Sequence, residues 1–385
     1  MSEQKIGVRA TPFLVPTGNY AKSGYTPSAL NHYYAADGDF PTGKGVTCGI
    51  VTAYGSPTLI EDLAVFSQTF ALPEADITLR GAGNASEIRS EWILESSLDS
   101  QWLHAFAPDA KICCYFAPSD DFSDIMETVR AAEGECDIVS LSFGRNEDGT
   151  ESRYEEFFRD SRALFVAAAG DGGAVQYPSC SPYVLCVGGT LLYLDEQGNA
   201  AHEECVWNGT GSGVSRYLAA PEHQNRFGAI ARDSGGKRAV PDLAFFAEGE
   251  RGAGAAFYHS TVAFGRSGWT DAVGTSVGAP CMAGICACLA ERDKRILSEK
   301  ARFFYDLAGG TAYTNPHRAF FDIVLGQSGA YAAAEGFDFC SGLGSPRARR
   351  FLQKKAPAPQ DTGGVGEKEK TNFSRVKFRR RPPSR

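Results

Sequence analysis

The sequence predicts an α/β protein whose core is a doubly wound, mainly parallel β-sheet in a single domain. Short runs of β-branched and aromatic residues alternate with stretches of helical periodicity. The strand candidates are apolar at consecutive positions, which is typical of strands covered by helices on both faces. The chain has 385 residues and is 43% hydrophobic, so it can bury one large core.

Strand and helix candidates follow one another along the first half of the chain. Strands are expected at 45–51, 111–116, 137–143, 163–169 and 183–187. Helices are expected at 59–70, 122–132 and 154–161, together with an acidic helix that includes 91–99. The second half is richer in glycine and turns, and its one long apolar helix is expected at 276–292.

The two ends of the chain differ in composition from its body. We assign residues 1–19 to a leader, 20–353 to the main domain and 354–385 to a disordered basic tail rich in proline, glycine and charge. No apolar run reaches the ~18 residues of a membrane span. The N-terminus leads into no apolar signal segment. By sequence alone we therefore expect a cytoplasmic protein without a transmembrane helix.

Charge and cysteine content narrow the classes of partner and site. The net charge is −8, although the tail carries ten Lys/Arg against three Asp/Glu, so the body is more acidic than the whole. An acidic body argues against nucleic acid as a partner. The eleven cysteines lie mostly in apolar runs without zinc spacing, and we expect reduced, structural thiols. A disulfide stays open for the cysteines in or beside loop-like sequence, which are Cys180, Cys186, Cys205 and Cys340.

A serine nucleophile candidate precedes the long apolar helix. Ser276 follows Gly274 and Thr275, and small residues come after it up to Pro280. At a helix N-terminus, backbone N–H groups and the helix dipole favour a developing oxyanion. Proline is tolerated in a first helical turn. The alternative interpretation is a plain N-cap serine on a core helix.

The acidic helix offers a general base made of carboxylates. Glu91, Glu95 and Asp99 recur every four residues, and Trp92 and Trp102 flank their face. Partial burial and mutual repulsion raise a carboxyl pKa, so two such groups tend to share one proton. A pair with one ionised member suits general base catalysis at acidic pH. The alternative is a solvated acidic face.

A third acid follows an apolar strand candidate. Asp171 lies in Ala-Ala-Gly-Asp-Gly-Gly, directly after the run at 163–169. In a doubly wound sheet, sites form beyond the carboxyl ends of the strands. A protonated aspartic acid there can donate a hydrogen bond to an oxyanion. The alternative is an aspartate in a turn.

Together and in this order, these segments resemble the sedolisin (serine-carboxyl peptidase) family. The similarity runs from 25 to 346 and includes the acidic helix, the segment ending at Asp171 and the Gly-Thr-Ser-x-x-x-Pro segment around Ser276. The resemblance implies a subtilisin-like fold. It also implies a serine-type endopeptidase that hydrolyses unfolded proteins at acidic pH, and we expect a monomer. That family is mostly secreted, in contrast to the compartment suggested by the N-terminus.

The resemblance also assigns roles to the four residues. Ser276 would attack the scissile carbonyl and Glu95 would take its proton. Asp99 would orient Glu95 and share a proton with it. Protonated Asp171 and the Ser276 backbone N–H would hold the oxyanion. The polypeptide substrate would lie as an added strand beside 142–144 and near 212–213.

A structural calcium site is implied by the same resemblance. Two segments near the C-terminus, 321–323 and 335–338, look like the calcium-binding part of the family. Calcium prefers carboxylate and backbone carbonyl oxygens. The expected ligands are the side chains of Asp322 and Asp338 and the carbonyls of Ile323, Ala334 and Gly336. The alternative is that the two loop aspartates only cap turns. Ala334 stands where the family usually has glycine, and a carbonyl ligand survives that change unless the position needs positive φ.

The chain departs from the family pattern in two side chains of the outer acidic network. Thr52 and Phe143 stand where some members have a glutamate and a tryptophan. Two alternative functions therefore stay open. One is a catalytically weak protein that keeps the fold to capture extended peptides. The other is ordinary histidine-based subtilase chemistry, for which His104 is the candidate, although no subtilisin-type histidine motif is present.

Overall fold

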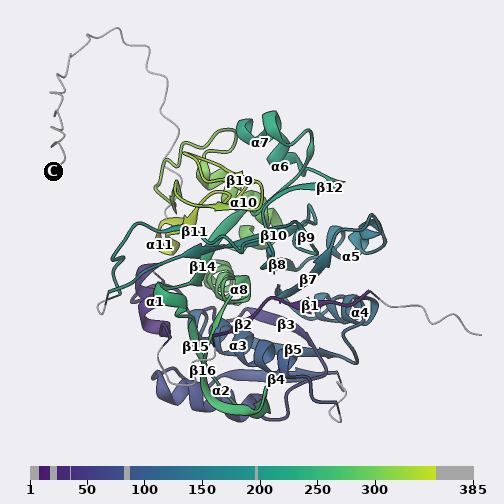
Figure 1. The fold of residues 1–385 in the computed structure, drawn as a ribbon, viewed down its shortest axis with the longest axis vertical. Coiled ribbons are helices and arrows are strands. Elements are labelled where there is room, and N and C mark those ends of the chain that lie inside the picture. The colour runs from purple at the N-terminus through teal and green to yellow at the C-terminus, as the bar shows by residue number, and fades with distance from the viewer. Residues whose placement is uncertain (1–7, 18–23, 35, 82–86, 196–197, 353–385) are drawn as a thin grey trace, which may run out of the picture. The chain divides into compact units, whose positions relative to one another are not determined.

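A computed structural model describes residues 8–17, 24–34, 36–81, 87–195 and 198–352 (Figure 1). Its central sheet has eight strands in the order β11-β10-β8-β6-β3-β5-β4, with β14 also paired to β10. Every pairing in this sheet is parallel except β10 with β11. The strands are β3 (Thr47–Ala53), β4 (Asp76–Arg80), β5 (Lys111–Ala117), β6 (Ile138–Leu141), β8 (Leu164–Ala168), β10 (Val184–Leu191), β11 (Cys205–Val206) and β14 (Leu243–Glu248).

Helices cover both faces of this sheet, as consecutive apolar residues in the strands predict. Ile50 of β3 packs in the core cluster that contains α3 (Ser90–Phe106) and α8 (Thr275–Arg292). Its neighbour Val51 packs in a second cluster with α4 (Phe122–Glu133) and α5 (Glu155–Arg159). Successive side chains of a strand point to opposite faces, so both must be apolar here. The predicted α/β class is confirmed.

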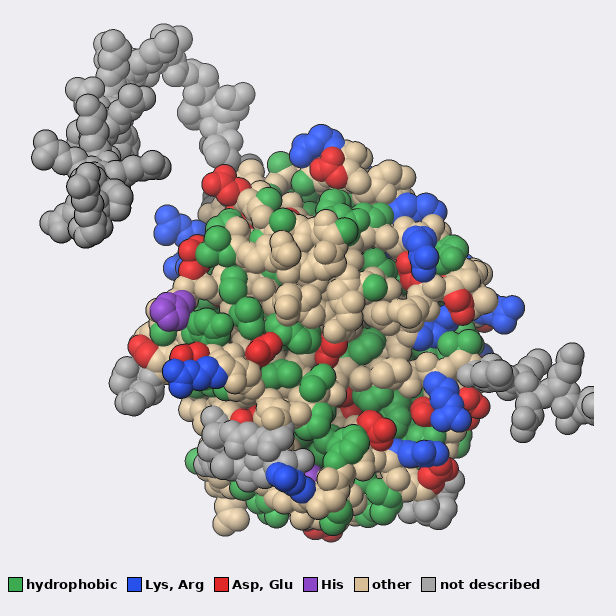
Figure 2. Space-filling view, viewed as in Figure 1, with side chains coloured by type: hydrophobic (Ala, Val, Ile, Leu, Met, Phe, Trp, Pro, Cys, Tyr) green, Lys and Arg blue, Asp and Glu red, His purple; other side chains and the backbone are tan. Residues whose placement is uncertain are grey.

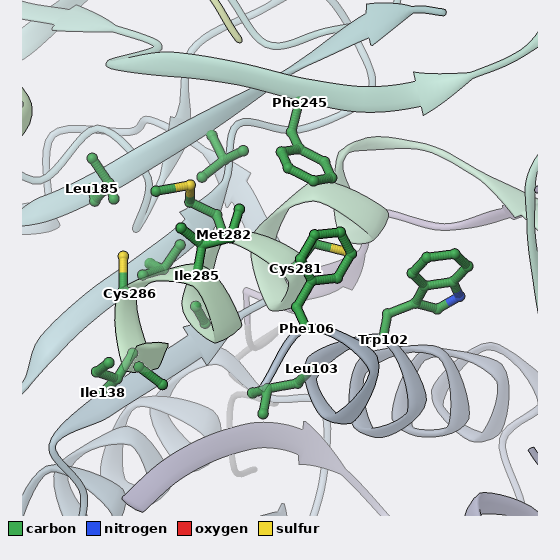
Figure 3. Packing of buried hydrophobic residues seen from close by; sticks show 14 of the residues in the cluster. Trp102, Leu103, Phe106, Ile138, Leu185, Phe245, Cys281, Met282, Ile285 and Cys286 are labelled. Carbon is green, nitrogen blue, oxygen red and sulfur yellow. The ribbon is translucent and has the colours of Figure 1, made fainter. Parts of the chain in front are cut away.

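Helices α3 and α8 pack closely, and this contact positions the candidate site. Phe106 of α3 and Phe245 of β14 lie beside α8 with ring centroids 5.6 Å apart (Figure 3). Gly284 of α8 permits the close approach, because a Cβ there would lie 2.7 Å from the Cβ of Phe106. Both helices are buried around almost their whole circumference. Their polar residues are therefore enclosed in the protein.

Several predicted boundaries differ from the structure. The segment expected as one strand at 137–143 is divided at Ser142 into β6 and β7 (Phe143–Asn146), which belong to different sheets. The helix expected at 154–161 is a 3-10 turn at Glu151–Arg153 followed by the short helix α5. Pro280 lies at the sixth residue of α8 rather than in its first turn.

The turn-rich second half contains strands that the sequence pattern did not indicate. β14 extends the central sheet, and β15 (Ala255–Ala263) and β16 (Arg266–Val273) form a long hairpin that packs against α3. The remaining elements are α1 (Pro27–Tyr33), α2 (Leu59–Thr69), β9 (Gln176–Tyr177), β12 (Gly213–Ala219), α6 (Glu222–Arg226), α7 (Gly228–Asp233), β13 (Lys237–Val240), a 3-10 turn (Glu250–Gly252), α9 (Arg295–Glu299), α10 (Ala301–Ala308), β17 (Phe320–Phe321), β18 (Gln327–Ser328), β19 (Tyr331–Ala332), β20 (Ser345–Pro346) and α11 (Ala348–Phe351).

Residues 8–17, which fall in the predicted leader, lie within the fold. β1 (Thr11–Pro12) pairs antiparallel with β7, and β2 (Val15–Pro16) pairs antiparallel with β16. In Figure 1 this dark purple segment runs past the N-terminal end of α8. The tail at 354–385 lies outside the described residues.

Two expectations from the sequence, on the cysteines and on membrane-spanning helices, can be compared with the described residues. All eleven cysteines are free thiols, and all but Cys205 are buried. No helix within the described ranges is long and apolar enough to cross a bilayer. On the face seen in Figure 2, Lys and Arg lie mainly around the rim, whereas uncharged side chains dominate the centre.

Candidate active site

The four predicted catalytic residues converge beyond the carboxyl ends of β6 and β8. Asp171 follows β8, and Ser276 is the second residue of α8. Glu95 and Asp99 lie one turn apart on α3, which packs against α8. Ser142, directly after β6, contacts both Asp99 and Ser276. The doubly wound topology thus gathers residues that are up to 181 positions apart in the chain.

Ser276 is held at the start of α8 by an unusual backbone conformation. Gly274, the residue before the helix, has φ of 129°, which favours glycine. A Cβ at Gly274 would lie 2.4 Å from Asp171 Oδ2, so a side chain there has no room. The Ser276 hydroxyl lies 3.4 Å from the carbonyl oxygen of Ser142. Its backbone N–H donates to the carbonyl oxygen of Phe13 at 3.3 Å.

The carboxyl groups of Glu95 and Asp99 are fully buried side by side. Ser142 Oγ donates to Asp99 Oδ1 at 2.7 Å. The other Asp99 oxygen and both Glu95 oxygens have no hydrogen-bond partner. An unpartnered buried carboxylate is costly, whereas a proton shared between two carboxyl groups removes one charge. The pair is therefore arranged to hold one proton between its two members.

The electrostatic environment favours this protonated pair. Burial, followed by the charge of Asp99, raises the pKa of Glu95 well above its usual value, although the nearby Ser276 hydroxyl lowers it. Burial also raises the pKa of Asp99, against the hydrogen bond from Ser142. Because each group affects the other, the two titrate as a unit. The neighbouring Glu91 is exposed at the surface of the same helix.

One carboxylate oxygen of Asp171 accepts hydrogen bonds from α8, and the other has no hydrogen-bond partner. Thr275 donates to Asp171 Oδ1 through its N–H at 2.9 Å and its hydroxyl at 2.8 Å. Oδ2 is buried without a partner and lies beside Gly274. Burial raises the pKa of Asp171 to about 7, although both Thr275 bonds lower it. A proton on Oδ2 would make this oxygen a hydrogen-bond donor next to the Ser276 N–H.

The two positions that depart from the family pattern are occupied by a hydrogen-bonded hydroxyl and a buried aromatic ring. Thr52 of β3 accepts a hydrogen bond from Ser96 Oγ at 2.9 Å, so a hydroxyl pair stands where some members have a carboxylate. Phe143 is buried, and its ring centroid lies 6.4 Å from that of Trp92 on α3. The polar network around Glu95 and Asp99 therefore ends at hydroxyl groups and aromatic rings.

The histidine alternative receives no support from the geometry. His104 lies in the last turn of α3, and its Nε2 contacts the carbonyl oxygen of Pro73 at 2.9 Å. Burial lowers the pKa of His104. Pro73 belongs to the connection between α2 and β4, whereas Glu95 lies near Ser276 and Asp99 contacts Ser142. His104 therefore fits a structural role better than that of a base.

The C-terminal loops bring the two predicted calcium carboxylates into one neighbourhood. Asp322 follows β17, and its Oδ2 accepts the N–H of Gly336 at 2.9 Å. Asp338 accepts the backbone N–H groups of Ala334, Cys340 and Ser341. Burial and the charges of Asp338 and Glu335 raise the pKa of Asp322. These carboxylates make no ion pair with a described Lys, Arg or His.

The predicted calcium ligands are all oxygen atoms, which is the ligand type that a hard cation takes. In the structure the two carboxylates accept backbone N–H groups, as aspartates that cap turns also do. Ala334 is not among the non-glycine residues with positive φ, so alanine is compatible with the backbone there. Within the described residues, no three His, Cys, Asp or Glu side chains form a metal-binding group. A cation in this loop would therefore depend on main-chain oxygens as well as on Asp322 and Asp338.

Comparison with known proteins identifies the family. The model of the subtilase family matches residues 84–307, which is more than half of the chain. Kumamolisin from Bacillus sp. (strain MN-32) is 32% identical over 299 residues, covering 69% of this chain and 51% of that protein. Sedolisin from Pseudomonas sp. (strain 101) is 26% identical over 391 residues, covering 89% and 62%.

The chain belongs to the subtilase family, and within it to the sedolisins. The predicted family is thus confirmed. This sedolisin chain spans about half to three fifths of the length of the relatives just named.

Solved structures agree on the fold of this sedolisin. The structure of Pseudomonas sedolisin, described as a serine-carboxyl proteinase, aligns with a TM-score of 0.74 at 24% identity and covers 86% of this chain and 97% of that chain. Sphericase aligns with a TM-score of 0.55 at 17% identity, covering 85% and 98%. The predicted subtilisin-like architecture is therefore confirmed.

The sequence pattern drew attention to 142–144 as a place for substrate but gave no role to the side chains of Ser142 and Thr275. Ser142 bonds to Asp99, and Thr275 bonds to Asp171. The Gly-Thr-Ser segment contained a signal for Thr275, because a threonine at the start of a helix can donate its hydroxyl to a neighbouring acceptor. The expected neighbours of substrate at 212–213 make other contacts. Ser212 donates to the carbonyl of Ser328, and Gly213 pairs with Val240.

Proposed function

We propose that this sedolisin is a serine-carboxyl endopeptidase that hydrolyses unfolded polypeptides at acidic pH. The observation that carries the proposal is the buried Glu95–Asp99 pair beside Ser276. The contact of His104 is with Pro73, away from this pair. A carboxyl pair that retains one proton supplies a base at a pH where histidine would be fully protonated. An extended substrate would take the edge of β7 at which β1 pairs in the structure.

The proposed reaction assigns one task to each side chain. The Ser276 oxygen attacks the scissile carbonyl carbon while Glu95 accepts the hydroxyl proton. Asp99, positioned by Ser142, takes part of the shared proton and keeps Glu95 basic. The Ser276 N–H and protonated Asp171 Oδ2 stabilise the oxyanion. Glu95 then gives the proton to the leaving amine, and water hydrolyses the acyl-enzyme by the same route.

The raised pKa values set the sign of the pH dependence. Asp171 is protonated below its pKa of about 7 and ionised above it. Ionisation removes a donor and places a negative charge beside the developing oxyanion, so activity should fall as the pH rises through about 7. On the acid side, activity should fall when both Glu95 and Asp99 are protonated and no base remains. Maximal activity is therefore expected between these limits.

Asp171→Asn tests the oxyanion role through a pH–rate profile. An amide accepts from Thr275 at one atom and donates at the other without titrating, so kcat should stay within about 10-fold of the wild type at acidic pH. The decline near pH 7 should move to higher pH. Asp171→Ala should lower kcat by about 10²- to 10³-fold throughout, because it removes the donor.

The profile is measured on a denatured protein substrate. Asp76→Asn, which changes an exposed carboxylate at the start of β4, is the matched control and should follow the wild-type curve. An Asp171→Asn profile that still declines at the wild-type pH would assign the alkaline limit to another group. A loss of 10²-fold or more in Asp171→Asn at acidic pH would contradict donation by Asp171.

A bound calcium ion is proposed as a structural component of the C-terminal loops. The ligands would be Asp322 and Asp338 together with the carbonyls of Ile323, Ala334 and Gly336. The ion would neutralise two carboxylates and hold the connection after β17 against the loop after β19. At a free concentration of 100 Kd, such an ion stabilises the folded state by about 2.7 kcal/mol.

Removal of calcium should therefore lower Tm by several degrees. Calcium titration after chelator treatment should restore Tm in the wild type, whereas Asp322→Asn should show a much smaller response because one charged ligand is lost. Asp306→Asn, on α10, should respond like the wild type. Equal calcium responses in the wild type and Asp322→Asn, measured by calorimetry and thermal unfolding, would place any ion elsewhere.

A further inference from the structure

The strand β4 is the last strand of the central sheet. Among the described residues it pairs only with β5, and this parallel register runs from Asp76 to Arg80 without a bulge. In Figure 1 it lies at the lower end of the sheet. The strand contains no proline or glycine, although proline and bulges commonly prevent the edge of one sheet from pairing with another. Its outer side can therefore accept a further strand.

A groove lies on each face of the sheet beside β4. The first, of about 290 Å³, separates β4 from α2 and is lined in part by Leu72 and Ile77. The second, of about 530 Å³, lies toward α4 and is lined in part by Arg80, Tyr115 and Glu135. Ile77 packs on the core cluster that includes α3, whereas Arg80 Nε donates to Glu135 Oε2 at 3.1 Å. Successive residues of β4 thus point to different grooves, and an added strand has space for side chains on both faces.

The face of β4 that meets α2 is apolar and partly exposed. Ile77 is half-buried, and Leu79 is 38% exposed. Ile60 of α2 lines the same groove as Ile77 and is 46% exposed. Leu79 and Ile88 line a further hollow of about 210 Å³ at the end of β4. Neighbouring apolar side chains that reach the surface mark interaction sites, because covering them removes apolar area from water.

The sequence of β4 is complementary to itself when two such strands run antiparallel. A two-fold axis through Thr78, perpendicular to the sheet, places Asp76 of one protomer opposite Arg80 of the partner subunit. The same axis places Ile77 opposite the partner subunit's Leu79, and it places the two Thr78 side chains opposite each other. Side chains that are directly opposite point to the same face of a sheet. The apolar pairs therefore lie on the α2 side, and the charged pairs lie on the α4 side.

The register centred on Thr78 matches the strand better than its neighbouring registers. It pairs all the residues of β4, whereas a shift by two residues pairs fewer of them and places Thr78 opposite a charged side chain. A shift by one residue would set the side chains of one face against those of the other. Opposite charges directly across a strand pair stabilise it, and like charges destabilise it. Because of the two-fold symmetry, the Asp76–Arg80 pair occurs twice in each dimer.

We propose that this sedolisin forms a symmetric dimer in which two β4 strands pair antiparallel about Thr78 and join the central sheets of two protomers. The occupant of the open sheet edge is thus a second copy of this chain, in contrast to the monomer expected from the family resemblance. The inference does not depend on the peptidase function, because Ser276 lies beyond β6 and β8, away from this edge. One strand pair and its flanking side chains form a small interface, so a Kd of about 10 µM is expected.

The first experiment measures the sedimentation velocity of the full chain from about 1 to about 200 µM, a range that spans the expected Kd. The samples are kept near neutral pH, where peptidase activity should be low, and under reducing conditions that protect the eleven free thiols. The sedimentation coefficient should rise reversibly from that of a monomer to that of a dimer. A chain that stays monomeric over the whole range overturns the proposal and leaves the sheet edge to a strand of another protein.

Two charge reversals test the register. Asp76→Arg and Arg80→Asp should each raise Kd by at least about 10-fold, because each dimer would contain two like-charge pairs. An equimolar mixture of the two variants should associate with a Kd within about 3-fold of the wild type, because opposite charges face each other again in the mixed dimer. Both variants should fold, since Asp76 is exposed and the Arg80–Glu135 ion pair is partly exposed, and thermal unfolding checks this.

The matched control is Asp233→Arg, at an exposed aspartate on α7. It makes the same change of charge outside β4 and should associate like the wild type. Equal weakening in Asp233→Arg and Asp76→Arg would assign the effect to net charge and contradict the β4 interface. Wild-type association in both Asp76→Arg and Arg80→Asp, or a mixture of these folded variants that stays monomeric, would also overturn the proposal.

Discussion

Ser276→Ala should abolish hydrolysis of an unfolded protein across pH 3 to 7. Loss of the nucleophile in enzymes of this kind lowers kcat by about 10⁵- to 10⁶-fold, because the remaining groups cannot form the acyl-enzyme. Folding should be little affected. The hydroxyl makes one long contact of 3.4 Å, and alanine fits the same buried position in α8. Turnover is measured with a quenched-fluorescence substrate, and folding by thermal unfolding.

The matched control for this substitution is Ser100→Ala. Ser100 is also a buried helical serine, but its hydroxyl donates to the carbonyl of Ser97 within α3. It should retain wild-type turnover. Ser276→Ala that retains substantial turnover would exclude Ser276 as the nucleophile. Tight peptide binding without turnover in the wild type would instead favour the peptide-capture alternative.

Glu95→Gln should lower kcat by about 10²- to 10⁴-fold, which is the usual contribution of a general base. Glutamine has nearly the same shape but cannot accept the Ser276 proton, and it leaves Asp99 without a carboxyl group to share a proton. The acid limb of the pH–rate profile should change as well, because the remaining Asp99 titrates without a coupled partner. KM should change less than kcat.

Glu91→Gln provides the control, one helical turn earlier on α3. Glu91 is exposed, whereas Glu95 is 0% exposed. The two substitutions remove the same charge from the same helix, so general electrostatic effects should appear in both. A similar decrease of kcat in Glu91→Gln and Glu95→Gln would mean that net charge, rather than proton transfer, controls the rate.

Most central strands and helices of the first half were predictable because burial imposes a simple pattern on them, whereas the partly exposed strand β4 was not predicted. Strands β3, β5 and β8 are apolar at successive positions, and a strand with helices on both faces requires this. The second half was less predictable. β14 continues the same sheet after a turn-rich stretch, and the β15–β16 hairpin, which packs on α3, lacks a clean alternation of buried and exposed residues.

The carboxyl pair was recognisable from the spacing of Glu95 and Asp99 and from the tryptophans around them. Spacing alone also made Glu91 a candidate base, because Glu91, Glu95 and Asp99 all recur at helical intervals. Only the packing of α3 leaves Glu91 at the surface and encloses the other two. The hydrogen-bond partners of Asp99 and Asp171 could not be predicted, because Ser142 and Thr275 lie 43 and 104 positions away from them in the chain.

The sequence by itself determined the α/β class, the family and the set of residues that bear the proposed chemistry. These features depend on local periodicity and short motifs, which can be recognised without the tertiary structure. Tertiary structure decided the rest. The burial that raises the pKa values of Glu95, Asp99 and Asp171 exists only when α3, α8 and the sheet enclose them. The segment at residues 9–17 resembled a leader because its strands are only two residues long. Its place beside Ser276 comes from pairing with β7 and β16, two strands that lie far away in the sequence.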